Sequence, residues 1–98
     1  MRQIEYSGQF KRDIKRIKKR GKNMDKIKPP MQFLIENRDL PAVFLDHPLH
    51  GSWKGCRDLH IEPDWILIYR LVKNIVRFER TGSHSDLFCL SVSLPVPV

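Results

Sequence analysis

The sequence predicts an α+β fold in the order β-α-α-β-β-β, with an antiparallel sheet packed on two N-terminal helices. The main observation is a change of periodicity. Apolar residues recur at helical spacing between residues 10 and 35, whereas after residue 53 they alternate or run continuously as in strands. The second observation is the length of 98 residues, which suits one modest core. We therefore expect a single domain over residues 1–88 and a loose tail over residues 89–98.

The N-terminal part of the chain favours a strand followed by a helix. Apolar side chains alternate weakly over residues 2–6, which indicates a short strand. Ser7 then suits a helix N-cap, because its hydroxyl can accept a hydrogen bond from a free amide of the first turn, and Gly21 suits the helix end. Between them lie three apolar residues with the i, i+4, i+7 spacing of an amphipathic helix: Phe10, Ile14 and Ile17.

A second helix is predicted between Asn23, a candidate N-cap, and residues 37–41, where it ends. Pro29 and Pro30 contradict an unbroken helix, because a proline in a helix interior removes a hydrogen bond and clashes one turn back, at a cost of about 3 kcal/mol. We expect a kink, or a helix that restarts with Pro29 in its first turn. The apolar residues that keep the helical spacing are Ile27, Met31, Leu34 and Ile35.

The second half of the chain predicts a loop and then a sheet. Residues 42–53 have little periodicity and read as a loop. The expected turns of the sheet are residues 62–63 and 73–74. The three expected strands cover residues 54–61, 65–72 and 75–81, and the middle one is almost entirely apolar, as in a central strand.

The expected turns allow the faces of the sheet to be assigned. With two-residue loops, His60 opposes Trp65, and both Asp58 and Arg80 oppose Leu67. Residues that face each other, or that are two apart on a strand, share one side of the sheet. Asp58, His60 and Arg80 are therefore expected on one face, and four apolar residues on the other: Leu59, Ile61, Ile66 and Ile68.

The charge of the chain is strongly positive and unevenly distributed. Lys and Arg number 18 against 11 acidic residues, a formal net charge of +7, and ten of the 18 lie between residues 11 and 28. Such a basic segment favours a polyanionic partner, first a nucleic acid and second an anionic membrane; the alternative is a cationic surface that is merely solvated. The lysines expected to form the basic face are Lys11, Lys15, Lys18 and Lys19.

The cellular compartment follows from the cysteines and from the opening residues. Cys56 and Cys89 do not form the pattern of a disulfide-rich scaffold. The first residues carry charges where a signal peptide would be apolar, and no run of 18 apolar residues could span a membrane. The expectation is a cytoplasmic protein with reduced thiols and no membrane partner.

Histidine, acidic and arginine side chains gather in the second half of the chain. RNA cleavage by the 2′-hydroxyl of the ribose needs a base, an acid and a cation that stabilises the charge on the phosphate. These residue types supply all three without a metal or another cofactor, and histidine moves protons best near neutral pH. The candidates are His47, His60, His84, Asp58, Asp64 and Arg80.

Two other interpretations of these residues remain open. A zinc site would use four N or S ligands, here His47, His50, Cys56 and His60, although an irregular loop with Pro48 is not a usual zinc knuckle. The basic face could also belong to a non-catalytic RNA- or DNA-binding module. Phe88 is a candidate for stacking on a base, whereas Trp53 and Trp65 are more typical of core residues in so small a domain.

Four longer segments of the sequence carry a resemblance to a known family. They are I-E-Y-S-G-Q-F at residues 4–10, L-P-A-V-F-L-D-H-P-L-H-G-S-W-K-G at 40–55, R-D-L-H-I-E-P-D-W-I-L-I-Y-R-L at 57–71, and R-F-E-R-T-G-S-H-S-D-L-F at 77–88. In these segments the chain resembles the YafQ-like branch of the RelE-type bacterial toxins. The resemblance implies a RelE-like fold and ribosome-dependent endonuclease cleavage of mRNA. It also implies neutralisation by a small cognate antitoxin, which in turn links the complex to operator DNA.

The resemblance also implies roles for single residues. The functional histidine of D-H-P-L falls on His47, that of D-x-H-x-E-P-D-W falls on His60 with its acid on Asp64, and the one after E-R-T-G falls on His84. Which histidine is the acid and which is the base stays open. Three further residues take substrate-binding places, for phosphate contact, base stacking and a weaker candidate role: Arg80, Phe88 and Asp58. The basic face is expected to dock on ribosomal RNA.

Overall fold

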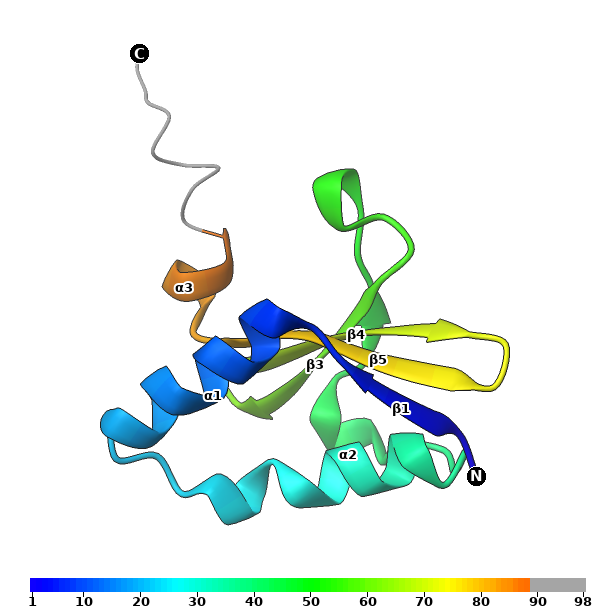
Figure 1. Ribbon diagram of the computed structural model, residues 1–98, viewed down its shortest axis with the longest axis horizontal. Helices are drawn as coiled ribbons and strands as arrows, with labels where there is room; N and C mark the ends of the chain where they lie inside the picture. Colours follow the sequence, from blue (N-terminus) through cyan, green and yellow to red (C-terminus); the bar gives the residue numbers. More distant parts are fainter. Residues whose placement is uncertain (89–98) are drawn as a thin grey trace.

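The computed structural model describes residues 1–88, so the tail expected over residues 89–98 lies outside the described residues. Figure 1 shows a sheet with α1 and α2 on one side, and with α3 and the connection that follows β2 on the other. The helices and strands, in chain order, are β1 Gln3–Tyr6, α1 Gly8–Lys19, α2 Lys28–Ile35, β2 His47–Pro48, β3 Arg57–Glu62, β4 Trp65–Val72, β5 Ile75–Gly82 and α3 His84–Phe88. The predicted α+β fold is confirmed.

The sheet has five strands in the order β1-β5-β4-β3-β2. Strands β2 to β5 pair antiparallel, whereas β1 joins the edge of β5 in parallel. Parallel strands cannot be joined by a tight turn, and β1 and β5 are indeed separated along the chain by two helices and three strands. The sheet therefore extends beyond the three expected strands on both sides.

Local signals at both N-terminal helices are confirmed. Ser7 Oγ accepts a hydrogen bond from the Phe10 amide at 2.9 Å, and Gly21 follows α1 with φ +82°, a conformation that glycine adopts without strain. The short 3₁₀ helix Met24–Lys26 is capped by Asn23, and α2 restarts after it with proline at its first positions. The expected restart at Pro29 is thus correct, since the first turn of a helix needs no proline amide.

Two apolar clusters cover the two faces of the sheet. The larger one joins the helices to β3, β4 and β5, and the predicted helix residues Ile17 and Leu34 are buried in it while Ile14 and Met31 pack against it. A second cluster forms on the opposite face, beneath α3: Cys56, Ile66, Ile68 and Leu87, with Leu49, Trp53 and Phe88 packed around it. The sheet is therefore buried on both sides, and the second face carries the candidate site.

The register corrects the expected faces of the sheet. The β3–β4 turn is at residues 63–64 and a bulge lies between His60 and Glu62, so that His60 opposes Ile66 and Asp58 opposes Ile68. The expected pairing of His60 with Trp65 is wrong, and so is the placement of Ile66 and Ile68 on the face away from His60. A bulge at Glu79 makes Arg80 oppose Ile68 as well. The strands β3 and β5 are therefore both shifted by one residue relative to β4, compared with the expected register. Because the two shifts are equal, Asp58, His60 and Arg80 still share one face.

Residues 42–53 are more ordered than the expected loop. They contain the two-residue strand β2, which pairs with Asp58 and Arg57 of β3, and two 3₁₀ turns, Ala42–Phe44 and Gly51–Trp53. The pairing brings His47 beside Asp58 at the edge of the sheet. Within residues 1–88, no helix has the length and apolar character needed to cross a membrane.

Candidate active site

Four rings form a row on the second face of the sheet, and they come from three elements. The ring centroids of His47 and His60 are 6.2 Å apart, those of His60 and His84 are 5.7 Å apart, and those of His84 and Phe88 are 6.2 Å apart. His47 lies on β2 and His60 on β3, while His84 and Phe88 lie one turn apart on α3. The three histidines singled out from the sequence are thus brought together in space.

His47 is held through its Nδ1 atom. This atom lies 3.0 Å from the carbonyl oxygen of Leu45 and 3.1 Å from Asp58 Oδ1. Both neighbours are acceptors, so Nδ1 carries the hydrogen and Nε2 keeps its lone pair in the neutral ring. A lone pair on an exposed histidine is what a general base requires.

Asp58 lies beside His47 on the neighbouring strand β3. Its side chain is buried, and burial raises the pKa of the carboxyl group, although the nearby His47 and His60 work in the opposite direction. Among the buried side-chain atoms of the described residues, Asp58 Oδ1 and His60 Nδ1 are two that have no hydrogen-bond partner. Unsatisfied buried polar atoms are uncommon in folded proteins, so these two atoms distinguish this part of the row from the rest of the sheet.

His84 is held by Asp64, which stands in the β3–β4 turn. Asp64 Oδ1 accepts hydrogen bonds from the His84 amide at 2.8 Å and from His84 Nδ1 at 2.6 Å. These bonds, the backbone one first, lower the pKa of Asp64, so that its carboxylate stays ionised. An ionised acceptor at this distance fixes the ring and suits a histidine that carries both protons.

Arg80 has a partner that the sequence did not suggest. Its Nε and Nη2 atoms lie 2.7 and 3.1 Å from the two carboxylate oxygens of Asp13, which is completely buried. Asp13 also accepts hydrogen bonds from the Thr81 amide at 3.1 Å and from Arg16 at 2.8 Å. Burial alone would raise the pKa of Asp13, but the hydrogen bonds from Arg80, Gln9 and the Thr81 amide outweigh it and hold the pKa below its usual value.

A signal for Asp13 was present in the sequence. Asp13 is three residues after Phe10 and four before Ile17, which places it on the apolar stripe of α1 rather than on the basic face. An acidic residue on the buried stripe of a helix needs a cation from another element. That cation is Arg80, and the bidentate contact fixes the plane of its guanidinium group against α1.

The aromatic candidates separate by burial. Trp65 is 1% exposed and donates a hydrogen bond from Nε1 to Thr81 Oγ1 at 2.9 Å, so it is a core residue. Trp53 packs against the second cluster, as expected for a core residue. Phe88 is half-buried in the same cluster and lies beside the ring of His84. Of the three, Phe88 is the one that belongs to the row.

The basic segment divides into two groups. Lys11, Lys15, Lys18 and Lys19 are exposed on α1, as expected. Within the described residues, five of the ten cations of the segment instead make ion pairs: Arg16, Arg20, Lys22, Lys26 and Lys28. Lys22 and Lys26 both contact Glu62, at 2.7 and 2.9 Å, and so tie the segment to the end of β3.

The zinc interpretation finds no support in the geometry. Across residues 1–88, no group of three or more His, Cys, Asp or Glu side chains is arranged to hold a metal ion. Cys56 is buried, and burial raises the pKa of its thiol, which disfavours the thiolate that zinc binds.

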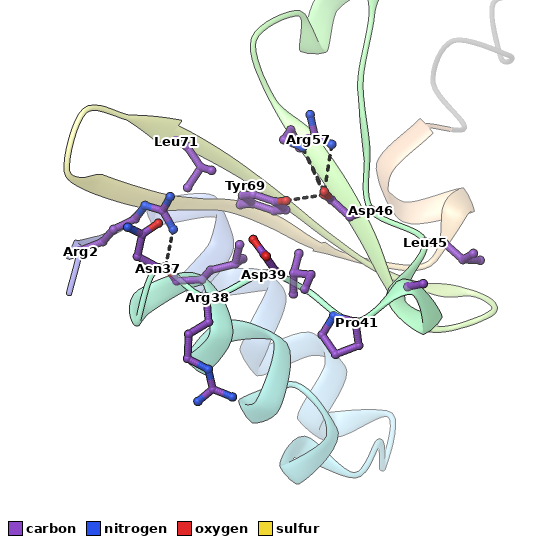
Figure 2. Close-up of a pocket in the computed structure, with 13 residues that line it drawn as sticks. Arg2, Asn37, Arg38, Asp39, Pro41, Leu45, Asp46, Arg57, Tyr69 and Leu71 are labelled. Carbon is purple, nitrogen blue, oxygen red and sulfur yellow. Dashed lines mark hydrogen bonds and ion pairs between the residues drawn. The ribbon is translucent and has the colours of Figure 1, made fainter.

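Asp46 anchors the segment that carries His47. It accepts hydrogen bonds from Arg57, at 2.9 Å, and from the hydroxyl of Tyr69. Figure 2 shows these three residues at the wall of a pocket of about 490 Å³, formed between β3, β4 and the chain that follows α2. Arg57 and Tyr69 oppose each other on the face away from His60, so this pocket is separate from the row of rings.

Comparison with known proteins agrees with this picture. Residues 2–89 match the family described as the bacterial toxin of the type II toxin-antitoxin system, YafQ. The chain is similar to the mRNA interferase toxin YafQ of Escherichia coli K12, with 60% identity over 89% of this chain and 96% of that protein. The crystal structure of YafQ from E. coli BL21(DE3) is similar as well, with a TM-score of 0.86, 58% identity and coverage of 90% of this chain and 99% of that one.

A solved complex is also similar. The toxin chain matched in the crystal structure of the E. coli DinJ-YafQ toxin-antitoxin complex has a TM-score of 0.83 and 60% identity, over 89% of this chain and 97% of that one.

Proposed function

The chain belongs to the YafQ family of bacterial type II toxins, and on this basis we propose that it is an mRNA interferase, an endoribonuclease that cleaves mRNA on the ribosome. The observation that carries the proposal is the row of His47, His60 and His84 with a carboxylate beside each of the outer two. Such a row offers one group that can act as a base and another that can act as an acid. The proposed catalytic domain is residues 1–88, and its ribosomal substrate places the activity in the cytoplasm.

The proposed reaction is the attack of a ribose on its own phosphate. His47 Nε2 takes the proton of the 2′-hydroxyl, whose oxygen bonds to phosphorus. The bond from phosphorus to the 5′-oxygen breaks, and His84 gives its proton to that oxygen. The products are a 2′,3′-cyclic phosphate, or the 3′-phosphate formed from it by water, and a free 5′-hydroxyl.

The remaining residues of the site support these two steps. His60 and Asp64 orient the reacting groups or share the proton transfer, and Asp58 holds His47 from below. Arg80 is proposed to neutralise the phosphate, with its guanidinium group oriented by Asp13. Phe88 stacks on a neighbouring base.

We expect cleavage of a defined mRNA on purified ribosomes to leave 2′,3′-cyclic phosphate or 3′-phosphate ends, because the ribose itself is the nucleophile. The protein is treated with EDTA and freed of the chelator before ribosomes are added, so that the ribosomes stay intact. The treated protein should cleave at the untreated rate, and end groups are identified by mass spectrometry. Fragments with 3′-hydroxyl ends, or activity that returns only with added zinc, would contradict the mechanism.

The proposed protein partner is a cognate antitoxin, because the family is a toxin-antitoxin family and the E. coli relative is solved with DinJ. Contact with operator DNA is proposed only through that complex. Expression of the chain alone should arrest growth, and co-expression of a neighbouring small open reading frame should restore it.

The exposed lysines of α1 are proposed to dock on ribosomal RNA. Changing Lys15, Lys18 and Lys19 to glutamate should weaken ribosome binding about tenfold or more. Each lysine that no longer neutralises a phosphate also no longer releases counterions from the RNA, which is the step that favours binding. Ribosome co-sedimentation measures the effect, and thermal unfolding shows whether the fold is kept. Lys73→Glu, at the β4–β5 turn, reverses one charge outside this face and should bind almost normally. Equal binding by all variants would contradict the proposal.

A further inference from the structure

The helix α3 is too short to place itself. It has five residues and carries both His84 and Phe88, two members of the ring row. An isolated helix of this length is unstable in water, so its position depends on contacts with the rest of the protein. One residue that makes such contacts is Asp86, which is not one of the site residues expected from the sequence.

Asp86 joins α3 to the end of α1. Arg20, the C-terminal cap of α1, donates from Nη1 to Asp86 Oδ2 at 2.6 Å and from Nη2 to Asp86 Oδ1 at 3.0 Å. Arg16 Nη2 lies 3.9 Å from the same carboxylate. The side chain of Asp86 is 13% exposed and that of Arg20 is 45% exposed. A two-pronged contact of this kind sets an orientation as well as a distance.

The same carboxylate also builds the first turn of α3. Asp86 Oδ2 accepts a hydrogen bond from the Ser83 amide at 2.9 Å, and the Asp86 amide donates to Ser83 Oγ at 3.1 Å. This reciprocal pair is a capping box, which fixes the start of a helix. At Gly82 a Cβ atom would lie 2.8 Å from Asp86 Oδ2, so only glycine allows this close approach.

We propose that Arg20 and Asp86 form a positioning clamp that sets α3, and with it the His84 ring, against the phosphodiester. Asp64 fixes the His84 ring from the β3–β4 turn, while the clamp fixes the helix that carries the ring, so both sides of His84 are held. This inference rests on the proposed endonuclease function. It also removes Arg20 from the cations that grip RNA.

The two possible roles of Arg20, RNA contact and positioning of α3, predict different effects of charge changes on ribosome affinity. If Arg20 gripped RNA, Arg20→Ala would weaken ribosome binding and Asp86→Ala, which removes a negative charge, would strengthen it. If the pair is a clamp, both changes lower the cleavage rate at saturating ribosomes and leave binding nearly unchanged. The double variant is then no slower than the slower single variant, because the same contact is lost.

The experiment measures single-turnover cleavage and ribosome affinity separately for Arg20→Ala, Asp86→Ala and the double variant. We expect the saturated rate to fall about 10- to 100-fold in each, since small displacements of a catalytic group cost that much. Arg77→Ala is the matched control, because Arg77 on β5 is about as exposed as Arg20 and also pairs with carboxylates, those of Glu79 at 3.2 Å and Glu5 at 3.4 Å. Its rate should stay within about twofold.

Two further measurements keep the test decisive. The imidazole NMR signals of His84 should shift in Arg20→Ala while those of His47 stay in place, which a general loss of stability would not produce. If Arg20→Ala or Asp86→Ala unfolds, Arg20→Lys takes its place in the experiment. Lysine keeps the positive charge but cannot make the two-pronged contact, so its cleavage rate should fall below that of the wild type, by less than about 10- to 100-fold. The clamp would be overturned if Arg20→Ala and Asp86→Ala cleaved at the same saturated rate as Arg77→Ala. It would also be overturned if Asp86→Ala bound ribosomes more tightly than the wild type. A wild-type protein without cleavage overturns the proposed function and the catalytic role of the clamp together, whereas failure of the clamp alone leaves wild-type cleavage intact.

Discussion

Replacing His84 with alanine should lower the rate of mRNA cleavage on the ribosome about 10²- to 10⁴-fold, the contribution of one proton-transfer group. The same loss is expected for His47→Ala, because the two residues stand at opposite ends of the histidine row and perform different proton transfers. Both side chains are exposed, so neither change should unfold the domain. Single-turnover cleavage measures the rate, and co-sedimentation should show unchanged ribosome binding.

His50→Ala is the matched control for these two variants. His50 is an exposed histidine three residues from His47, and it has no part in the row. Its removal should change the rate by less than about twofold, as for an ordinary surface substitution. Full activity in His84→Ala would exclude the proposed mechanism. A wild-type protein that binds ribosomes but cleaves nothing would instead indicate a non-catalytic RNA-binding module.

Replacing Asp13 with alanine should destabilise the fold by about 3–5 kcal/mol, the usual cost of removing one partner of a buried ion pair. The change leaves Arg80, whose side chain is 20% exposed, without its acceptors and leaves the Thr81 amide unpaired. For a domain of this size the melting temperature should fall by at least about 12 °C. Asp25→Ala removes an exposed carboxylate that pairs with Lys28, and should change stability by less than about 1 kcal/mol.

The pH dependence of stability gives an independent check on Asp13. Its folded pKa is below the usual value, so the carboxylate stabilises the protein above the unfolded pKa of about 4, and this stabilisation is lost as the pH falls through the folded pKa. Asp13→Asn should therefore show a flatter loss of stability below about pH 4 than the wild type. Equal acid unfolding of the two proteins would show that Asp13 is not held in this way.

The parts of the fold that were predictable are those with local signals. The strand Trp65–Val72 has the predicted bounds, because a continuous apolar run between turn residues is enough to define it. The strand His47–Pro48 and the five-residue helix α3 are too short for an apolar residue to recur at helical or strand spacing often enough to define them. They are stabilised by contacts with β3 and α1, which are distant in the sequence and cannot be predicted from local patterns.

The candidate site divides in the same way. Its three histidines could be named from the sequence, because each stands in a motif of the resemblance, but the carboxylates that orient two of them depend on the register of the sheet. The pairing of His47 with Asp58 needs the strand β2, and the pairing of His84 with Asp64 needs the turn at residues 63–64. The buried pair of Asp13 and Arg80 joins residues 67 positions apart, a distance that no spacing rule bridges.

The ion pairs inside the basic segment have a thermodynamic consequence for ribosome binding. A plot of log affinity against log salt concentration has a slope of about −0.7 to −0.9 for each phosphate that a cation neutralises. Ten available cations would give a slope of about −7 to −9, but the five cations of the segment outside these ion pairs, Arg12 and the four exposed lysines of α1, give only about −3.5 to −4.5. A cation that stays paired with a carboxylate of the protein does not neutralise a phosphate, so it releases no counterion from the RNA. Affinity for the ribosome should therefore decline gently between dilute buffer and cellular ionic strength, less steeply than a net charge of +7 would suggest.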